Sequence, residues 1–398
     1  MPLSFLKKKK SPIWERIEHD DITRLRTKYD TYYHIFEDQK GTRVTKDGKE
    51  YVMLSSNDYL GLSHHPKIKE AGIEALKKWG SSTTGARLAN GGRSFHRELE
   101  EELANFIGKE SCHVFSAGYL ACASSVTGFV GRKDIVLADK NLHSSLWSGI
   151  KLSGAHCERF AHNHPEHLRE ILEAEEKETG KAVVLEGIYS MEGHIARLPE
   201  LTAIAKEFDC FTILDDAHGF GVLGKDGRGT ADHFGLTDEI DVISGSFSKS
   251  LSGIGGFVAS SKQAIEFMRS HSKQTIFSAA LTPVACACAK AALQVMQDEP
   301  EHRERLFKNL ERYTSLLKEL SLDTWESEAP AVPIVLGEKE KVYYFWKALL
   351  EKGIYSIISI APGVPPGKDL IRTAISGAHT EDDLDRIEEG IRYAATKI

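Results

Sequence analysis

Short apolar segments alternate with helix-like segments over residues 64–290, and this alternation constrains the fold more than any other feature. The apolar segments are 111–115, 134–139, 182–187, 211–216 and 241–246. Each is followed by a polar or glycine-containing turn and then by helical periodicity, as in 198–208. Near-continuous apolar strands separated by helices predict an α/β fold, with a mostly parallel sheet covered by helices on both faces.

The segments on either side of this region follow other patterns. Residues 41–54 predict a hairpin that turns at Asp47-Gly48. After about residue 291 the helices become longer and more charged, with strand candidates at 331–337 and 370–376 between them. We therefore expect three parts: an N-terminal segment with a hairpin (1–63), a large α/β domain (64–290) and a smaller C-terminal α+β domain (291–398).

Composition excludes several classes of protein. The net charge of -7 argues against nucleic acid as a partner, and no run of 18 apolar residues is present to span a membrane. The six cysteines lack the paired spacing of a disulfide framework, and Cys286 and Cys288 lie in an apolar run without nearby histidines, so we expect no metal site. The lysines at 7–10 predict a solvated tail, with weak contact to anionic lipid as the alternative. We expect a reduced, cytoplasmic protein.

Polar side chains with chemical potential follow the predicted strands. They are His143 after 134–139, Ser190 after 182–187, Asp215 and His218 at the end of 211–216, and Lys249 after 241–246. Ligands of open α/β sheets bind at the carboxyl ends of the strands. We therefore expect these residues to converge at one edge of the sheet.

Lys249 stands in the sequence Gly-Ser-Phe-Ser-Lys-Ser, between Ser246, Ser248 and Ser250. Hydroxyl and backbone N–H groups can hold a phosphate, while the lysine amine can form an imine with a carbonyl. Asp215 reaches the interior after an apolar stretch and can keep a pyridine nitrogen protonated, which makes such a ring an electron sink.

The remaining candidates would surround the same ring. His218 can bond its phenolic oxygen, His143 can lie over its face, and the N–H groups of Gly118 and Tyr119 at a helix start can bind phosphate. Each residue alone also has a plain structural explanation, as a solvated lysine, a helix-capping aspartate or a hydrogen-bonded histidine. The joint pattern is what favours a functional site.

The motifs that carry these residues resemble one family across nearly the whole chain. The resembling stretches are 55–66 (SSNDYLGLSHHP), 85–108, 115–121 (FSAGYLA), 185–201, 214–229, 245–260, 277–283 (FSAALTP) and 370–380 (LIRTAISGAHT). In this order they are similar to the α-oxoamine synthases, which are pyridoxal-phosphate enzymes of fold type I. The resemblance implies a central, mostly parallel sheet with helices on both faces and a smaller C-terminal domain.

The resemblance also implies a role for each candidate. Lys249 would carry the cofactor covalently and then act as the base on the substrate. Asp215 would pair with the pyridine nitrogen, His143 would stack on the ring, and His218 and Ser190 would contact the phenolic oxygen or its surroundings.

Phosphate and substrate contacts follow in the same way. The implied phosphate ligands are Ser246, Ser248, the amides of Gly118 and Tyr119, and Ser278 from the second subunit of a homodimer with shared active sites. Arg372 would hold the amino-acid carboxylate, because its planar fork of donors suits that group, with Asn57 nearby and Arg87 as a further substrate contact.

The family condenses an amino acid with an acyl-CoA, releasing CoA and usually carbon dioxide. In Gly85-Ala86-Arg87-Leu88, two positions that are polar in aminolevulinate synthases are apolar, which favours an uncharged acyl chain. The 245–257 stretch resembles serine palmitoyltransferases, so serine with a long acyl-CoA is preferred. The 214–229 stretch resembles 8-amino-7-oxononanoate synthases, which use alanine and a pimeloyl thioester, and the residues after Leu142 resemble autoinducer-type synthases.

Two further alternatives remain. Glycine C-acetyltransferase belongs to the same family, and a pyridoxal-phosphate lyase or aminotransferase on the same fold would be a different class of enzyme.

Overall fold

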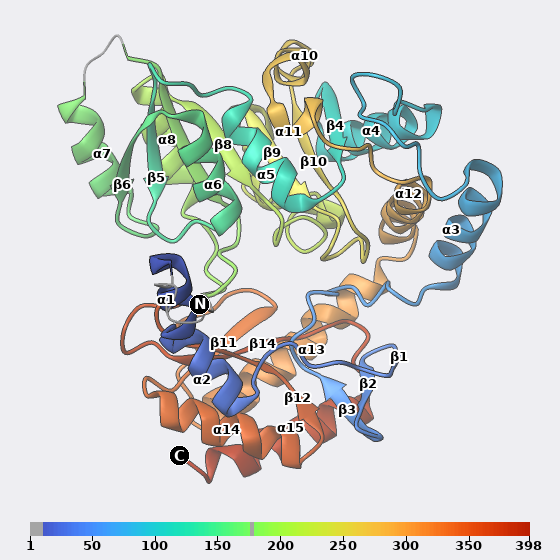
Figure 1. The fold of residues 1–398 in the computed structure, drawn as a ribbon, viewed down its shortest axis with the longest axis vertical. Helices are drawn as coiled ribbons and strands as arrows, with labels where there is room; N and C mark the ends of the chain where they lie inside the picture. Colours follow the sequence, from blue (N-terminus) through green and yellow to red (C-terminus); the bar gives the residue numbers. More distant parts are fainter. Residues whose placement is uncertain (1–10, 176–178) are drawn as a thin grey trace, which may run out of the picture.

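A computed structural model describes residues 11–175 and 179–398 (Figure 1). The predicted lysine tail at 7–10 lies outside the described residues. The helices are α1 (Pro12–Glu18), α2 (Asp21–Tyr29), α3 (Pro66–Trp79), α4 (Ser94–Ile107), α5 (Gly118–Thr127), α6 (Ser144–Ser153), α7 (Pro165–Ala174), α8 (Leu198–Glu207), α9 (Thr230–His233), α10 (Lys262–His271), α11 (Lys273–Ile276), α12 (Pro283–Asp298), α13 (Glu301–Glu319), α14 (Lys339–Glu351) and α15 (Glu381–Ala395). The strands are β1 (Asp38–Lys40), β2 (Arg43–Lys46), β3 (Lys49–Met53), β4 (Ser111–Phe115), β5 (Ile135–Asp139), β6 (His156–Phe160), β7 (Lys181–Glu186), β8 (Phe211–Asp215), β9 (Val242–Ser246), β10 (Gly256–Ser260), β11 (Ala331–Val335), β12 (Ile354–Tyr355), β13 (Ile357–Ser359) and β14 (Leu370–Ala374).

The central sheet has the strand order β4-β10-β9-β8-β7-β5-β6. Only β10 runs against its neighbours, so the predicted α/β class with a mostly parallel sheet is confirmed. The five predicted strands correspond to β4, β5, β7, β8 and β9. The sequence analysis missed β10 and β6. Strand β6 is an edge strand whose residues are mostly polar and not fully buried, so it lacks an apolar run.

Helices cover this sheet and hide its strands. Every residue of β5, β7, β9 and β10 is buried. Helix α5 packs against β9 and β10, α4 packs against β4, and α8 packs against β8. Burial on both sides explains why these strands read as continuous apolar segments rather than as alternating ones.

The N-terminal and C-terminal elements lie together below the central sheet (Figure 1). Strands β2 and β3 form the predicted hairpin, with Asp47 and Gly48 at φ 50° and 70° in its turn. Strand β3 then pairs in parallel with β12, so a strand from residues 49–53 belongs to the same sheet as one from residues 354–355. The division of the chain at residues 63 and 290 stays a prediction.

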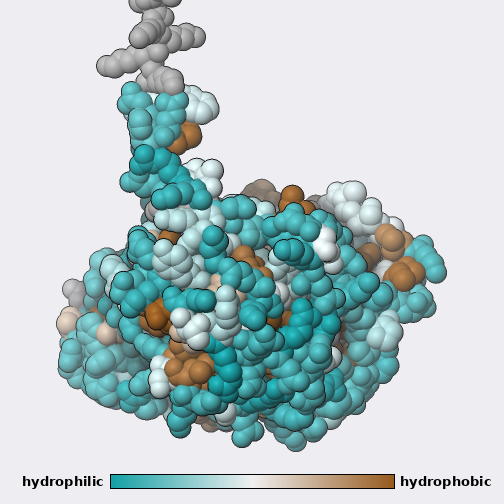
Figure 2. Space-filling view, turned by 90° about the horizontal axis from the view of Figure 1, so that it is seen from below, coloured by the Kyte–Doolittle hydropathy of each residue, from teal (hydrophilic) through white to brown (hydrophobic). Residues whose placement is uncertain are grey.

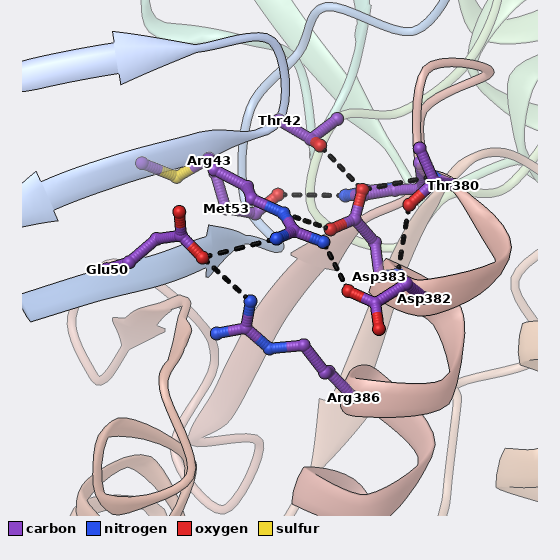
Figure 3. Close-up of polar contacts among 9 residues, drawn as sticks. Thr42, Arg43, Glu50, Met53, Thr380, Asp382, Asp383 and Arg386 are labelled. Carbon is purple, nitrogen blue, oxygen red and sulfur yellow. Dashed lines mark hydrogen bonds and ion pairs between the residues drawn. The ribbon is translucent and has the colours of Figure 1, made fainter.

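Asp383 joins the hairpin to the start of α15 (Figure 3). Its carboxylate accepts hydrogen bonds from Arg43 Nε and Thr42 Oγ1, both at 2.8 Å, and Arg43 also reaches Glu50 at 3.3 Å. Asp383 and Thr380 cap the helix reciprocally. Burial raises the pKa of Asp383, but the hydrogen bonds from Thr380, Thr42 and Arg43 outweigh burial, so its pKa lies below the ordinary value.

The surface seen from below is mainly hydrophilic, with separate apolar side chains among polar ones (Figure 2). Helix α1 has no buried residue, and Ile13, Trp14 and Ile17 are more than half exposed. Within the described ranges, no helix combines the length and apolar character needed to cross a membrane. The cytoplasmic location stays a prediction.

Candidate active site

A cavity of about 200 Å³ lies where strands of the central sheet end. Its lining contains most of the candidates from the sequence: Gly118, Tyr119, His143, Asp215, His218, Ser246, Ser248 and Lys249. These residues lie at the carboxyl ends of β8 and β9, at the start of α5 after β4, or in the loops after β5, β8 and β9. The expected convergence at one edge of the sheet is therefore observed, while the role of each side chain stays a prediction.

One end of the cavity is formed by the start of α5. Gly118 is the first residue of this helix and packs directly against Ser246, because a Cβ at Gly118 would lie 2.4 Å from Ser246 Oγ. Ser246 Oγ and Ser248 Oγ are hydrogen-bonded at 2.8 Å. The first N–H groups of a helix have no partner within the helix and attract anions. Small side chains, two hydroxyls and a helix start together fit a phosphate group.

Asp215 lies at the buried end of β8, and the N–H of Ala217 donates to its Oδ1 at 3.0 Å. The thiol of Cys122 lies beside it. Burial raises the pKa of Cys122, and the charge of Asp215 raises it further, so the thiol stays neutral. The carboxyl group of Asp215 therefore lies in the cavity lining beside a neutral thiol, where it can face a protonated ring nitrogen.

His143 lies between this cavity and a second one and lines both. Its Nδ1 is 2.7 Å from Ser145 Oγ, and its backbone N–H donates to the carboxylate of Glu186. Desolvation lowers the pKa of His143, and Lys249 lowers it further against the opposing effect of Asp215. A neutral imidazole can lie against an aromatic ring without the cost of covering a charge.

His218 is buried, and its Nδ1 lies 2.7 Å from the hydroxyl of Tyr59. Burial lowers the pKa of His218 well below the ordinary value, and the positive charges of Lys249 and Arg372 add to the effect. The ring is therefore neutral and acts through hydrogen bonds rather than through charge.

The second cavity has a volume of about 810 Å³ and shares His143, His218 and Lys249 with the first. Asn57, Ser190 and Arg372 lie in its wall. These are the residues that the sequence assigned to substrate or to the cofactor's surroundings. The two cavities thus form one site with a cofactor-sized part and a wider substrate part.

Arg372 is only 6% exposed and is held by two acceptors. Its Nε donates to the carbonyl of Ser190 at 2.9 Å, and its Nη2 donates to Asn57 Oδ1 at 3.0 Å. Both acceptors are neutral, so the positive charge of the guanidinium has no ionic partner among these contacts. A carboxylate in the cavity would provide one.

Two predicted site residues lie elsewhere. Arg87 makes a paired contact with Glu100, at 2.7 and 3.0 Å, and lines neither cavity. Ser278 also lines neither cavity, and its neighbour Ala279 forms a bridge with Ala86. The roles of Arg87 in substrate binding and of Ser278 at a partner's phosphate stay predictions.

The structure adds residues that sequence reasoning missed. Tyr59 lies within the recognised 55–66 stretch, but only its neighbour Asn57 was singled out. Glu186 ends β7, and burial, with help from the charge of Asp215, raises its pKa well above the ordinary value. A polar residue at the end of an apolar strand was the available signal for Glu186, because the same signal identified Asp215.

One group of possible metal ligands occurs among the described residues, namely His65, Glu299 and His302. Glu299 already accepts from Lys67 Nζ at 2.7 Å, and Arg305 Nη2 lies 2.9 Å from His302 Nδ1. Because the protein supplies positive charge to this cluster from two side chains, the cluster is accounted for as an ion-pair network between α3, α12 and α13.

A family model described as aminotransferase class I and II matches residues 49–391. The serine palmitoyltransferase of Sphingobacterium spiritivorum is 38% identical over 382 residues, which are 96% of this chain and 96% of that protein. The chain belongs to the class I and II aminotransferase family. Within that family, its relatives are α-oxoamine synthases.

Two further relatives support the same placement. An 8-amino-7-oxononanoate synthase from Thermoanaerobacter pseudethanolicus is 37% identical over 352 residues, covering 88% of this chain and 89% of that protein. A solved structure of serine palmitoyltransferase from S. paucimobilis, with a bound PLP–myriocin aldimine, has a TM-score of 0.93 at 32% identity and covers 97% of this chain and 99% of that one. This chain is a PLP-dependent acyltransferase of the α-oxoamine synthase family, and its cofactor is pyridoxal phosphate.

Proposed function

We propose that this protein condenses serine with a long, uncharged acyl-CoA, releasing CoA and carbon dioxide, as a homodimer. The observation that carries the proposal is the 38% identity to a serine palmitoyltransferase over 96% of both chains. The TM-score of 0.93 to another serine palmitoyltransferase supports it.

In this reaction Arg372 binds the amino-acid carboxylate. Its Nε and Nη2 are fixed by Ser190 and Asn57, so the guanidinium is held in place before the substrate arrives. Preorganisation of this kind lowers the entropy cost of binding. The carboxylate fixes one end of the amino acid, and the α-carbon then lies toward Lys249, which lines the same cavity.

Lys249 moves the proton at the α-carbon of the substrate. When bound, pyridoxal phosphate supplies an electron sink that stabilises negative charge at this carbon. Asp215 would hold a proton on the ring nitrogen, and Ser246, Ser248 and the start of α5, which line the same cavity, would hold the phosphate. The neutral rings of His143 and His218 would contact the cofactor through packing and hydrogen bonds rather than through charge.

Acyl-chain choice is assigned to the 85–88 loop. Ala86 and Leu88 offer no polar group to a charged acyl end, and Leu88 is 63% exposed. The loop is joined to segment 277–283 through the Ala86–Ala279 bridge, and that segment carries Phe277. An apolar surface of this kind favours methylene groups, at about 0.8 kcal/mol for each buried one.

A second candidate is 8-amino-7-oxononanoate synthesis from alanine and a pimeloyl thioester. The observation that favours it is the 37% identity to such a synthase over 88% of the chain. Glycine with acetyl-CoA, the substrate pair of a glycine C-acetyltransferase, is a further outcome that the same assay distinguishes.

The test is a screen of serine, alanine and glycine against acyl-CoAs of increasing length, with release of free CoA as the signal. We expect the fastest release with serine and a long chain. Alanine with pimeloyl-CoA as the best pair would favour the second candidate instead. Ala86→Thr combined with Leu88→Asn should weaken long-chain use, whereas Leu152→Asn, at a leucine 69% exposed and outside both cavities, should not.

A further inference from the structure

A chain of hydrogen bonds crosses from the central sheet to the C-terminal part of the protein beside the substrate cavity. Asp139 Oδ1 lies 3.1 Å from His162 Nδ1, and His162 Nε2 lies 3.0 Å from His194 Nδ1. His194 Nε2 lies 2.6 Å from the carbonyl oxygen of Trp325. The two imidazole planes are 22° apart, so the rings are nearly parallel, with their centroids 5.2 Å apart.

Both ends of this chain are acceptors. Trp325 contributes a carbonyl oxygen, which can only accept. Asp139 is fully buried and its carboxylate accepts from three other donors, the N–H groups of Asn141 and Asn163 and the hydroxyl of Tyr189, at 2.7–2.9 Å. A carboxylate offers about four acceptor positions, so these three contacts leave one position for His162.

The chain has three contacts, Asp139–His162, His162–His194 and His194–Trp325, and each needs one proton between its two atoms. Two neutral imidazoles carry only two such protons. We propose that the Asp139–His162–His194 chain holds one extra shared proton, so that the histidine pair carries a positive charge opposite Asp139. Without this proton, two acceptors would face each other at about 3 Å in one of the three contacts. A buried acceptor pair of that kind is costly.

The charged groups around the pair are consistent with a positive charge. Glu192 lies close by; burial raises its pKa, and His162 and His194 oppose that rise. Glu328 accepts from the backbone of the same turn at 3.2 Å. Lys368 is the nearby cation, and it lies over the Trp325 ring at 5.1 Å.

The chain fixes a turn that carries a substrate contact. Residues 188–195 form a closed turn, with Ile188 bridged to Ile195 and the N–H of Gly193 donating to the carbonyl of Tyr189 at 2.8 Å. At its tip, the carbonyl of Ser190 accepts from Arg372 Nε. His162 and His194 are thus positioning residues for Arg372, and this step rests on the proposed role of Arg372 in binding the amino-acid carboxylate.

The extra proton gives amino-acid binding a pH dependence with a defined sign. While the extra proton is present, the hydrogen-bonded chain fixes the 188–195 turn. When rising pH removes this proton, one hydrogen bond of the chain is lost and the turn is fixed less firmly. We expect the amino-acid dissociation constant to rise by about 3- to 10-fold across that transition, which corresponds to one hydrogen bond.

The direct test is ¹⁵N NMR of histidine-labelled holoenzyme at pH 7.5, about one unit above the ordinary histidine pKa of about 6.5. We expect one imidazolium signal, assigned by its change in His162→Gln and His194→Gln. In Asp139→Asn, an amide Nδ2 in place of Oδ1 can donate to His162 Nδ1 while both rings are neutral, and it loses the hydrogen bond from the N–H of Asn141. The imidazolium signal should therefore disappear in Asp139→Asn, at the carboxyl end of β5, and persist in the control Asp241→Asn, just before the amino end of β9.

His194→Gln gives a second, independent reading. Its amide can donate to the carbonyl of Trp325 and accept from His162 Nε2, so the signal should persist on His162 alone. Only neutral rings in the parent at pH 7.5, or an imidazolium that survives Asp139→Asn, would overturn the proposal. The NMR result does not depend on which amino acid is the substrate, so failure of the proposed function would show separately, as a failure to bind serine, alanine and glycine.

Discussion

Arg372 offers the sharpest test of the substrate part of the site. It is 6% exposed, and two neutral acceptors fix its orientation, which leaves its positive charge without an ionic partner in these contacts. In Arg372→Ala, the amino-acid carboxylate loses a charge-assisted hydrogen-bonding partner. Such a contact contributes about 1.5–3 kcal/mol, or about a 10- to 150-fold change in the dissociation constant.

Two companion variants separate charge from geometry. Arg372→Lys keeps the charge but loses the planar fork, so its effect should lie between those of the parent and Arg372→Ala. Asn57→Ala removes only the acceptor that orients Nη2, and a loss of about 0.5–1.5 kcal/mol is expected.

The assay is titration of the holoenzyme with the amino acid, followed by the change in cofactor absorbance. Cofactor content should stay at the parent level in all three variants, because Arg372 lies in the wall of the wider cavity and not of the smaller one. An Arg372→Ala enzyme that binds its amino acid as tightly as the parent would refute the assignment. Loss of cofactor in the same variant would show that Arg372 acts through the fold instead.

Three further outcomes are expected. Gly118→Ala should weaken cofactor binding by about 1–3 kcal/mol in equilibrium dialysis, because the new Cβ would lie 2.4 Å from Ser246 Oγ; unchanged binding would remove the phosphate assignment. Asp383→Asn should lower the free energy of unfolding in urea by about 1–3 kcal/mol near neutral pH. Since the folded-state pKa of Asp383 is lowered, its contribution is present above the unfolded pKa and is lost as pH falls through the folded pKa, so parent and variant should converge in acid. Mixing inactive Lys249→Ala with inactive Ser278→Asp should restore activity through one intact site in a mixed dimer, and no restoration would contradict the shared site.

The fold could be predicted from sequence because the central strands are buried on both faces. Strands such as β5 and β7 have no solvent-facing positions, so each appears as an apolar run with a clear end. Strand β6 could not be found in this way, because it lies at the sheet edge and its sequence, His-Cys-Glu-Arg-Phe, is mostly polar.

The cofactor part of the site could be predicted for a related reason. Asp215 and Lys249 each follow a strand of one parallel sheet, so the topology alone brings them together. Tyr59 and Glu186 were harder to assign. Tyr59 reaches His218 from a loop far away in the sequence, and a contact of that kind has no local pattern.

The His162–His194 chain lay further beyond sequence reasoning. Each histidine is one of 17 in the chain, and neither follows an apolar run that would mark it as buried and functional. The proposed extra proton follows from counting hydrogen-bond donors and acceptors along the chain. That count needs the positions of Asp139 and Trp325 as well as those of the two histidines.

Arg87 and Ser278, the predicted site residues outside both cavities, each stand next to a large exposed apolar side chain in the sequence. Segment 277–283 carries Phe277 at 81% exposure and Ser278 beside it, and the bridged 85–88 loop carries Leu88 at 63% exposure. Large apolar side chains exposed to this degree gain about 1.5–3 kcal/mol each on full burial. A second copy of the chain that covered Phe277 would bring Ser278 with it, because the two residues are adjacent in sequence. The burial that favours a dimer and the delivery of a hydroxyl to the partner's phosphate would then be one event, which is why the mixed-dimer experiment tests both together.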